Sequence, residues 1–172
     1  GMKRVWTLRR DEFVVAAITA GTVVLVGVLQ GIIIAIVLSL IDHLRRSYRP
    51  PTAVMTPMTG DRPGDWSAGR VTPDVRTEPG LVVYRFGASL YYANANLFFE
   101  QTSAFATAAD PPRWLCIDAA AIPDIDYSGG ETIRQLVSEL QEHDIKLVVA
   151  EPMHTVRDDL DRYGLTEVIG AD

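Results

Sequence analysis

The chain has 172 residues, of which 48% are hydrophobic and 22% charged, and its net charge is −6 at pH 7. Residues 1–50 carry seven Lys and Arg against three Asp and Glu, whereas residues 51–172 carry nine against nineteen, and scattered basic residues in an acidic body exclude nucleic acid as a partner. The single cysteine, Cys116, excludes an intrachain disulfide, and the three histidines show no metal-ligand spacing with it or with one another, so no metal or cofactor is predicted.

The first predicted element is an apolar run over residues 13–41, which contains no charged residue. A single helix of this length would extend about 43 Å, beyond the roughly 30 Å hydrocarbon core of a membrane. Basic residues before and after the run favour both ends on the cytoplasmic face. Two interpretations stay open: one long tilted helix, or a hairpin of two short helices that bends at residues 27–31, where Gly27 and Gly31 lower helix propensity. Residues 1–49 are therefore predicted to be a membrane segment in contact with lipid, helical over about 12–45.

Residues 50–79 come next and are rich in proline and glycine. They lack the periodicity of a helix or a strand, except that residues 53–55 could form a short edge strand. The sequence therefore predicts a linker between the membrane segment and a domain that begins at residue 80.

Residues 80–172 alternate between short apolar runs and amphipathic stretches. The predicted strands cover residues 81–86, 89–92, 114–118 and 146–150, with a tight turn at Gly87-Ala88 between the first two. The predicted helices cover residues 94–108, 128–143 and 155–163, and Gly164 ends the last of them. This order predicts an α/β fold, a mixed β-sheet of partly parallel strands with α-helices packed on it.

The loop over residues 124–131 is the most informative stretch for function. Ser128 and Glu131 have the spacing of a capping box, which explains both residues structurally. The same position would place the Ser128 hydroxyl at a helix N-terminus, where free N–H groups favour a phosphate, although the charges of Asp124, Asp126 and Glu131 oppose one. Local physics therefore favours the cap. No base accompanies Ser128 and Asp126 replaces the first glycine of a hydrolase elbow, so we predict no enzymatic activity.

Several segments together resemble the C-terminal end of bacterial SulP sulfate-type anion transporters. The apolar hairpin, the arginine-rich exit and the segments PGLVVYRFGASLYYANANLFFE, PPRWLCIDAAAIPDIDYSGGETIRQLVSEL and RDDLDRYGLTEVIGAD follow the order of that family. The Tyr92-Ala93-Asn94-Ala95 element, the Asp-Ile-Asp-x-Ser-Gly loop and Ile169-Gly170 fall where the family has them. Residues 58–78 match poorly.

The resemblance implies that residues 80–172 form a cytoplasmic STAS domain, a fold shared with bacterial anti-sigma factor antagonists. In those antagonists the serine that aligns with Ser128 is phosphorylated, although Tyr127 stands here where a small residue is usual. The implied switch loop consists of Asp126, Tyr127, Ser128 and Gly129, and the implied contacts to a nucleotide or partner are Asn94, Asp124 and Gly130. Such domains usually add a last strand and helix after Ile169-Gly170, so an exposed sheet edge is expected.

The implied function is that of the C-terminal fragment of a secondary active transporter for an inorganic, sulfate-like anion in the inner or plasma membrane. Its STAS domain would regulate transport. The implied partners are the rest of the transporter's membrane domain, a regulatory protein, acyl carrier protein or nucleotide, and a second copy in a homodimer. The alternative is a stand-alone phospho-switch protein of the anti-sigma antagonist type that binds a kinase. Such proteins are soluble, so the apolar run over residues 13–41 discriminates between the two hypotheses.

Overall fold

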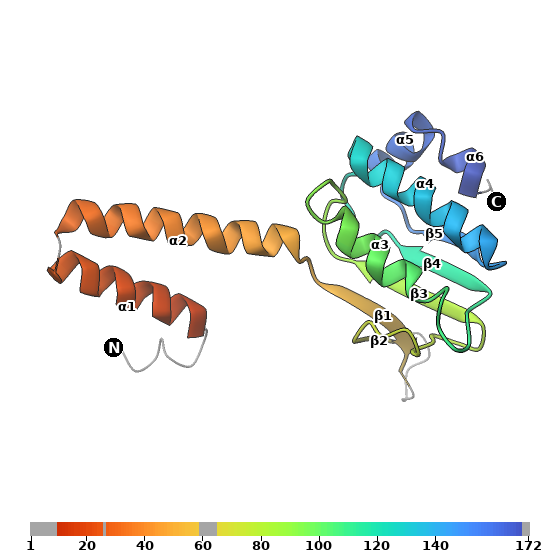
Figure 1. Cartoon of the computed structure of the whole chain (residues 1–172), viewed down its shortest axis with the longest axis horizontal. Coiled ribbons are helices and arrows are strands. Elements are labelled where there is room, and N and C mark those ends of the chain that lie inside the picture. Colours follow the sequence, from red (N-terminus) through yellow and green to blue (C-terminus); the bar gives the residue numbers. More distant parts are fainter. Residues whose placement is uncertain (1–9, 26, 59–64, 170–172) are drawn as a thin grey trace. The chain divides into compact units, whose positions relative to one another are not determined.

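The computed structural model describes residues 10–25, 27–58 and 65–169 (Figure 1). The chain divides into two compact units, Gly1–Arg46 and Ser47–Asp172, and each is described by itself.

The first unit consists of two helices, α1 (Arg10–Leu25) and α2 (Val28–Tyr48), the second of which continues two residues past the unit boundary. Gly27 lies between them with a φ of 115°, a conformation that glycine adopts far more readily than other residues. The two helices run in opposite directions from this break (Figure 1). The break lies at the start of the predicted bend, and Gly31 is inside α2, where its N–H donates to the Gly27 carbonyl at 3.2 Å.

Helix α2 contains an 18-residue window, Val28–Arg45, that is long and apolar enough to cross a membrane. The apolar part of α1, Glu12–Gly21, is shorter. Large apolar side chains of α2, including Ile32, Ile36 and Leu40, are exposed. The helix therefore presents apolar surface that the described part of the chain does not cover.

The second unit is built on a five-stranded sheet with the strand order β2-β1-β3-β4-β5. The strands are β1 (Thr52–Pro57), β2 (Trp66–Gly69), β3 (Leu81–Phe86), β4 (Trp114–Asp118) and β5 (Lys146–Ala150). Strand β1 pairs antiparallel with β2 and β3, whereas β3, β4 and β5 are parallel. The predicted mixed sheet is confirmed.

Two sequence-based assignments differ from this sheet. The predicted linker, residues 50–79, contributes β1 and β2, and β1 lies inside the sheet because it pairs on both sides and buries Val54. Residues 89–92, predicted to be a strand, form only an isolated bridge between Leu90 and Ile125. The Asn94 side chain prevents a second ladder there, because it accepts from the Tyr91 N–H and donates to the Ser89 carbonyl.

Four helices follow in the second unit: α3 (Ala95–Ser103), α4 (Tyr127–Glu142), α5 (His154–Arg162) and α6 (Thr166–Ile169). Helix α3 ends five residues before the predicted end at residue 108, whereas α4 and α5 lie within one residue of their predicted bounds.

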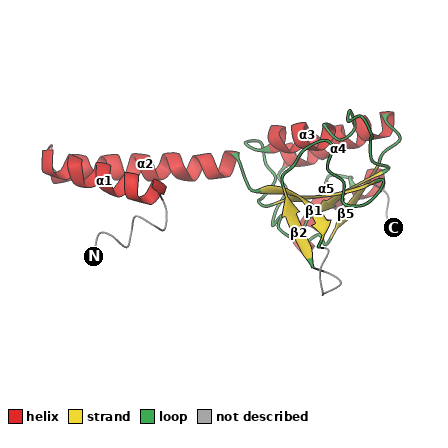
Figure 2. Ribbon diagram, turned by 90° about the horizontal axis from the view of Figure 1, so that it is seen from below, coloured by secondary structure: helices red, strands yellow, loops and turns green. Residues whose placement is uncertain are grey.

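Helices α3 and α4 cover one face of the sheet (Figure 2). Between them and the sheet, the ring of Phe98 makes edge contacts with Tyr84 and Phe86, at centroid distances of 5.9 and 5.5 Å. Burial raises the pKa of Tyr84, whose hydroxyl donates to Gln101 Oε1 at 2.7 Å. The core therefore lies on the helix side of the sheet.

Candidate functional site

The candidate site lies where the loops after β3 and β4 meet. Because these strands are parallel, their C-terminal ends share one edge of the sheet, which is a common place for functional loops. The Leu90 N–H donates to the Asp124 carbonyl at 3.0 Å, and the Asp126 N–H donates to the Leu90 carbonyl at 3.0 Å. The structure thus brings the loop that ends at Asn94 next to the loop that contains Asp124 and Asp126.

Asp126 is the N-cap of α4. Its backbone is extended, with φ −79° and ψ 177°, and its Oδ1 accepts from the Gly129 N–H at 2.7 Å. Its Oδ2 accepts from the Tyr92 N–H at 3.3 Å, across 34 residues of sequence. One carboxylate therefore both caps the helix and fastens the neighbouring loop to it.

The predicted capping box of Ser128 and Glu131 is therefore wrong. Ser128 is the second residue of α4, because the Asp126 carboxylate already caps the helix two residues earlier. The Glu131 carboxylate instead pairs with Arg134, with 3.5 Å between Nε and Oε1. The motif has the right chemistry, but the N-cap lies two residues earlier than the spacing indicated.

Ser128 is half-buried, and its hydroxyl has no hydrogen-bond partner among the described residues. Its carbonyl accepts from the Thr132 hydroxyl at 2.8 Å, as in an ordinary helical turn. The hydroxyl lies in the first turn of a 16-residue helix, where the helix dipole favours an added negative charge. The neighbouring carboxylate of Asp126 opposes that charge.

Gly129 and Gly130 are required by close packing. A Cβ at Gly129 would lie 2.5 Å from the Leu90 carbonyl oxygen, and a Cβ at Gly130 would lie 2.8 Å from the Tyr163 ring. Gly130 and Asn94, both predicted to contact a nucleotide or partner, are buried. Asn94 holds its loop through its amide group and Gly130 packs against the Tyr163 ring, so neither residue is exposed to a partner at the surface.

The exposed part of the site is formed by two tyrosines and Asp124. Tyr92 and Tyr127 are 70% and 68% exposed, and the Tyr127 ring makes an edge contact with Tyr163 at 6.1 Å. Asp124 is also exposed. Sequence reasoning named Tyr92 only within the motif of residues 92–95 and gave it no role at the site, because its place beside Asp126 depends on a contact between distant loops.

Sequence reasoning also missed Asp159, which supports the site from α5. This residue is buried, its Oδ2 accepts from the Ile125 N–H at 3.3 Å, and its Oδ1 pairs with Arg162 Nη1 at 2.8 Å. It attaches α5 to the loop over residues 124–131.

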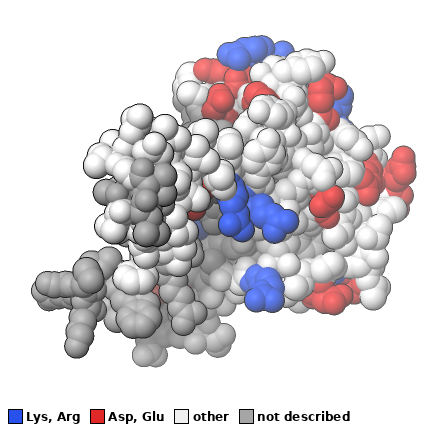
Figure 3. All heavy atoms as spheres, turned by 60° about the vertical axis from the view of Figure 1, so that its left-hand side comes forward, with Lys and Arg blue, Asp and Glu red and all other residues white. Residues whose placement is uncertain are grey.

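Charged side chains of both signs are interspersed on the face of the molecule shown in Figure 3. Within residues 10–25, 27–58 and 65–169, no group of three His, Cys, Asp or Glu side chains is arranged to hold a metal ion. The site therefore offers a free hydroxyl, exposed aromatic rings and carboxylates.

Comparison with known proteins gives one family match. Residues 72–171, more than half of the chain, match the family model described as the STAS domain. The match includes the whole candidate site.

Similar curated proteins are sulfate transporters by name. A probable sulfate transporter of Mycobacterium tuberculosis is 30% identical over 174 residues, which cover 99% of this chain and 30% of that protein. High affinity sulfate transporter 1 of Stylosanthes hamata is 28% identical over 182 residues, covering 99% of this chain and 27% of that protein. The chain thus spans less than a third of the length of these relatives.

Among solved structures, the murine Solute Carrier 26 family member A9 anion transporter in its inward-facing state is similar, with a TM-score of 0.74. The similarity covers 96% of this chain and 26% of that one, at 13% sequence identity. At this identity the similarity concerns the fold.

Proposed function

The chain belongs to the STAS-domain family, and we propose from this that it is the C-terminal part of a SulP-type transporter of an inorganic, sulfate-like anion. The observation that carries the proposal is the junction of an apolar two-helix segment to a STAS domain in one chain. The named sulfate transporters align with 99% of the chain, and so with both parts. A stand-alone phospho-switch protein would contain the STAS domain but would not require the apolar helix α2.

The proposed location is a membrane, with α2 inside it and the STAS domain in the cytoplasm. Arg45 and Arg49 lie at the domain end of α2, and basic residues favour the cytoplasmic side. Because the helices run in opposite directions, both ends of the segment return to that side (Figure 1). The apolar side chains of α2 would then contact lipid and the rest of the transporter's membrane domain.

The proposed regulatory element is the loop over residues 124–131, with Ser128 as the modified residue. A phosphate brings a charge of about −1.5 to −2 and three acceptor oxygens. On Ser128 it would repel the Asp126 carboxylate and compete with it for N–H groups at the start of α4. The Asp126 contacts to Gly129 and Tyr92 would weaken, and the loop over residues 87–94 would be freed. Tyr92, Tyr127 and Asp124 would present the change to a regulatory protein or nucleotide.

Sulfate uptake by the complete transporter that carries this chain tests the proposal. We expect Ser128→Asp to change the initial uptake rate at least threefold relative to Ser128→Ala. Ser138→Asp is the matched control, because Ser138 is exposed on the same helix and distant in sequence from the N-cap. Surface expression of each variant is measured in parallel, so that a change in rate is separated from a change in amount.

Two results would contradict the proposal at different levels. Uptake of no inorganic anion by the complete protein would overturn the transporter assignment. Uptake that responds equally to Ser128→Asp and Ser138→Asp would leave the transporter assignment standing and remove the switch.

A further inference from the structure

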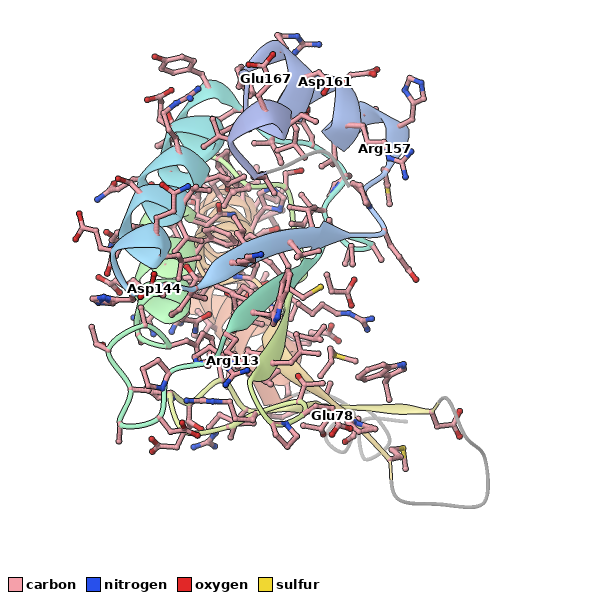
Figure 4. The ribbon with its side chains drawn as sticks, turned by 90° about the vertical axis from the view of Figure 1, so that its right-hand side faces the viewer. Glu78, Arg113, Asp144, Arg157, Asp161 and Glu167 are labelled. Carbon is pink, nitrogen blue, oxygen red and sulfur yellow. The ribbon has the colours of Figure 1, made fainter. Side chains whose placement is uncertain are left out.

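The strand that follows α2 begins at the same edge of the sheet as the candidate site. The register pairs Thr52, the first residue of β1, with Phe86, the last residue of β3. The loop over residues 87–94 starts directly after this pair. The opposite edge is marked in Figure 4 by the labelled residues that precede β3, β4 and β5, namely Glu78, Arg113 and Asp144.

One hydrogen bond extends the pairing of β1 and β3 into the loop of the candidate site. Pro51 and Gly87 face each other one residue beyond Thr52 and Phe86, and the Gly87 N–H donates to the Pro51 carbonyl at 2.9 Å. Proline has no N–H, so Pro51 cannot return the second bond that such an antiparallel pair usually exchanges. The ladder of β1 and β3 therefore ends on a single bond, and its donor belongs to the loop over residues 87–94.

The same contact is closely packed. A Cβ at Gly87 would lie 2.8 Å from Pro51 Cγ and 2.9 Å from the Pro51 carbonyl oxygen. Carbon atoms in ordinary contact are about 3.5–4.0 Å apart, so a side chain at residue 87 would displace Pro51. The backbone of Gly87 lies outside the left-handed region. Glycine is therefore required here by the approach of Pro51 and not by the backbone conformation.

The other end of this loop is fixed by the candidate site. Leu90 exchanges backbone hydrogen bonds with Asp124 and Asp126, each of 3.0 Å. Two residues separate Leu90 from Gly87. A displacement at the start of α4 would therefore reach the Pro51 contact through a short segment that is bonded at both ends.

The link between α2 and β1 is short and conformationally restricted. Helix α2 ends at Tyr48 and β1 begins at Thr52, so the link consists of Arg49, Pro50 and Pro51. Proline fixes its own φ and restricts the residue before it. Pro50 is also buried. The link thus has few rotations that could absorb a displacement of Pro51.

We propose that Gly87 and Pro51 are positioning residues that pass the state of the loop over residues 124–131 to α2. While the site holds the loop over residues 87–94, the Gly87 N–H holds Pro51 and fixes the start of β1. When that loop is freed, this bond opens, and the displacement of Pro51 is passed through the link to the end of α2. The route starts from the proposed modification of Ser128, and it therefore rests on the proposed function.

The first experiment follows the Gly87 amide by NMR in the full chain, labelled with ¹⁵N-glycine in detergent micelles. Ser128→Asp should raise the hydrogen-exchange rate of this amide at least fivefold, because its acceptor is released. Ser138→Asp is the matched control and should change the rate less than twofold. The Gly164 N–H, which donates to the Asp161 carbonyl at 3.0 Å, is the internal reference and should keep its rate in both variants.

The second experiment measures sulfate uptake by the complete transporter that carries this chain. Gly87→Ala should change the initial uptake rate at least threefold with Ser128 unmodified, since the added Cβ displaces Pro51. Gly69→Ala is the matched control on β2, where a Cβ would lie 3.5 Å from the Val54 carbonyl oxygen, an ordinary contact. It should change the rate less than 1.5-fold. Rates are normalised to surface expression, and circular dichroism of the full chain checks that each variant folds.

The substitutions are then combined with Ser128→Asp. In the Gly87→Ala background, Ser128→Asp should change the uptake rate less than 1.5-fold, whereas a glycine with a merely structural role would leave the response to Ser128→Asp intact. Pro51→Ala is a second variant that does not depend on how well Gly87→Ala folds. It keeps the carbonyl acceptor but frees φ, and it should reduce the response to Ser128→Asp at least twofold.

The outcomes distinguish this route from the proposed switch. If the response to Ser128→Asp persists unchanged in both Gly87→Ala and Pro51→Ala, the route is overturned and the switch stands. A changed uptake rate with an unchanged exchange rate of the Gly87 amide in Ser128→Asp also overturns the route. If uptake changes with Gly87→Ala and with Asp126→Ala but not with Ser128→Asp, the route is supported and Ser128 is not its switch. The exchange measurement does not depend on which anion is transported.

Discussion

Helices α2 and α4 carry similar apolar side chains in opposite environments. On α4, Leu136 and Leu140 are buried against the sheet, and polar residues occupy the other side of the helix. On α2, Ile36 is 62% exposed, and apolar residues surround the helix. A helix that is apolar all round is typical of a membrane span or a large core. The partner of α4 is therefore encoded in this chain, whereas we expect the partner of α2 to be lipid or other membrane helices.

Phe98→Ala, in the core that α3 shares with the sheet, should have the greatest effect. The change removes a buried ring that contacts Tyr84 and Phe86, and should lower the free energy of unfolding by about 3–5 kcal/mol. Urea unfolding of the full chain, followed by circular dichroism, measures the loss. The control is Ile36→Ala, which should change the domain's stability by less than about 0.5 kcal/mol. If Phe98→Ala and Ile36→Ala lowered the free energy of unfolding equally, the apolar side chains of α2 would stabilise the domain as much as those of its core, which would contradict this comparison.

A charge in α2 should have the next greatest effect, on membrane insertion. Ile36 lies at the centre of the Val28–Arg45 window, where a lysine costs about 2.5–3.5 kcal/mol of insertion free energy. We therefore expect Ile36→Lys to shift the chain from the carbonate-resistant membrane fraction to the soluble or aggregated fraction. Ile36→Leu should leave the distribution unchanged. A lysine variant that stays in the membrane as well as the leucine variant would mean that this face of α2 does not contact lipid.

A smaller effect is expected from two residues at the start of α4. Asp126→Ala removes the N-cap and should cost about 1 kcal/mol, because the Gly129 N–H loses its acceptor. Ser128→Ala should cost less than about 0.5 kcal/mol, since the hydroxyl makes no contact that caps the helix. Asp126→Asn keeps an acceptor and should retain most of the stability. Urea unfolding measures the stability of the three variants. A larger loss of stability for Ser128→Ala than for Asp126→Ala would support the capping box of Ser128 and Glu131.

Local patterns predicted most of the second unit. The runs over residues 81–86, 114–118 and 146–150 became β3, β4 and β5, because each is a short apolar segment bounded by turn residues. Residues 53–55 were expected at most as a short edge strand, whereas β1 is longer and pairs on both sides, and β2 was missed. Proline and glycine dominate the surrounding sequence, and the pairing of β1 with β3 is a long-range contact. Residues 89–92 have a strand-like composition. The buried Asn94 side chain hydrogen-bonds with the Tyr91 N–H and the Ser89 carbonyl, and these bonds hold the segment in a turn instead of a strand.

The amino-acid sequence was sufficient to predict the apolar segment with its basic ends and the α/β order. These features depend on charge, periodicity and spacing within short stretches of chain. Only the folded arrangement revealed that Asp126 caps α4 and holds Tyr92, that Asn94 and Gly130 are buried, and that Trp114 and Val148 are exposed on one face of the sheet. Each of these depends on which distant segments meet, and a local pattern carries no information about the partner across the sheet.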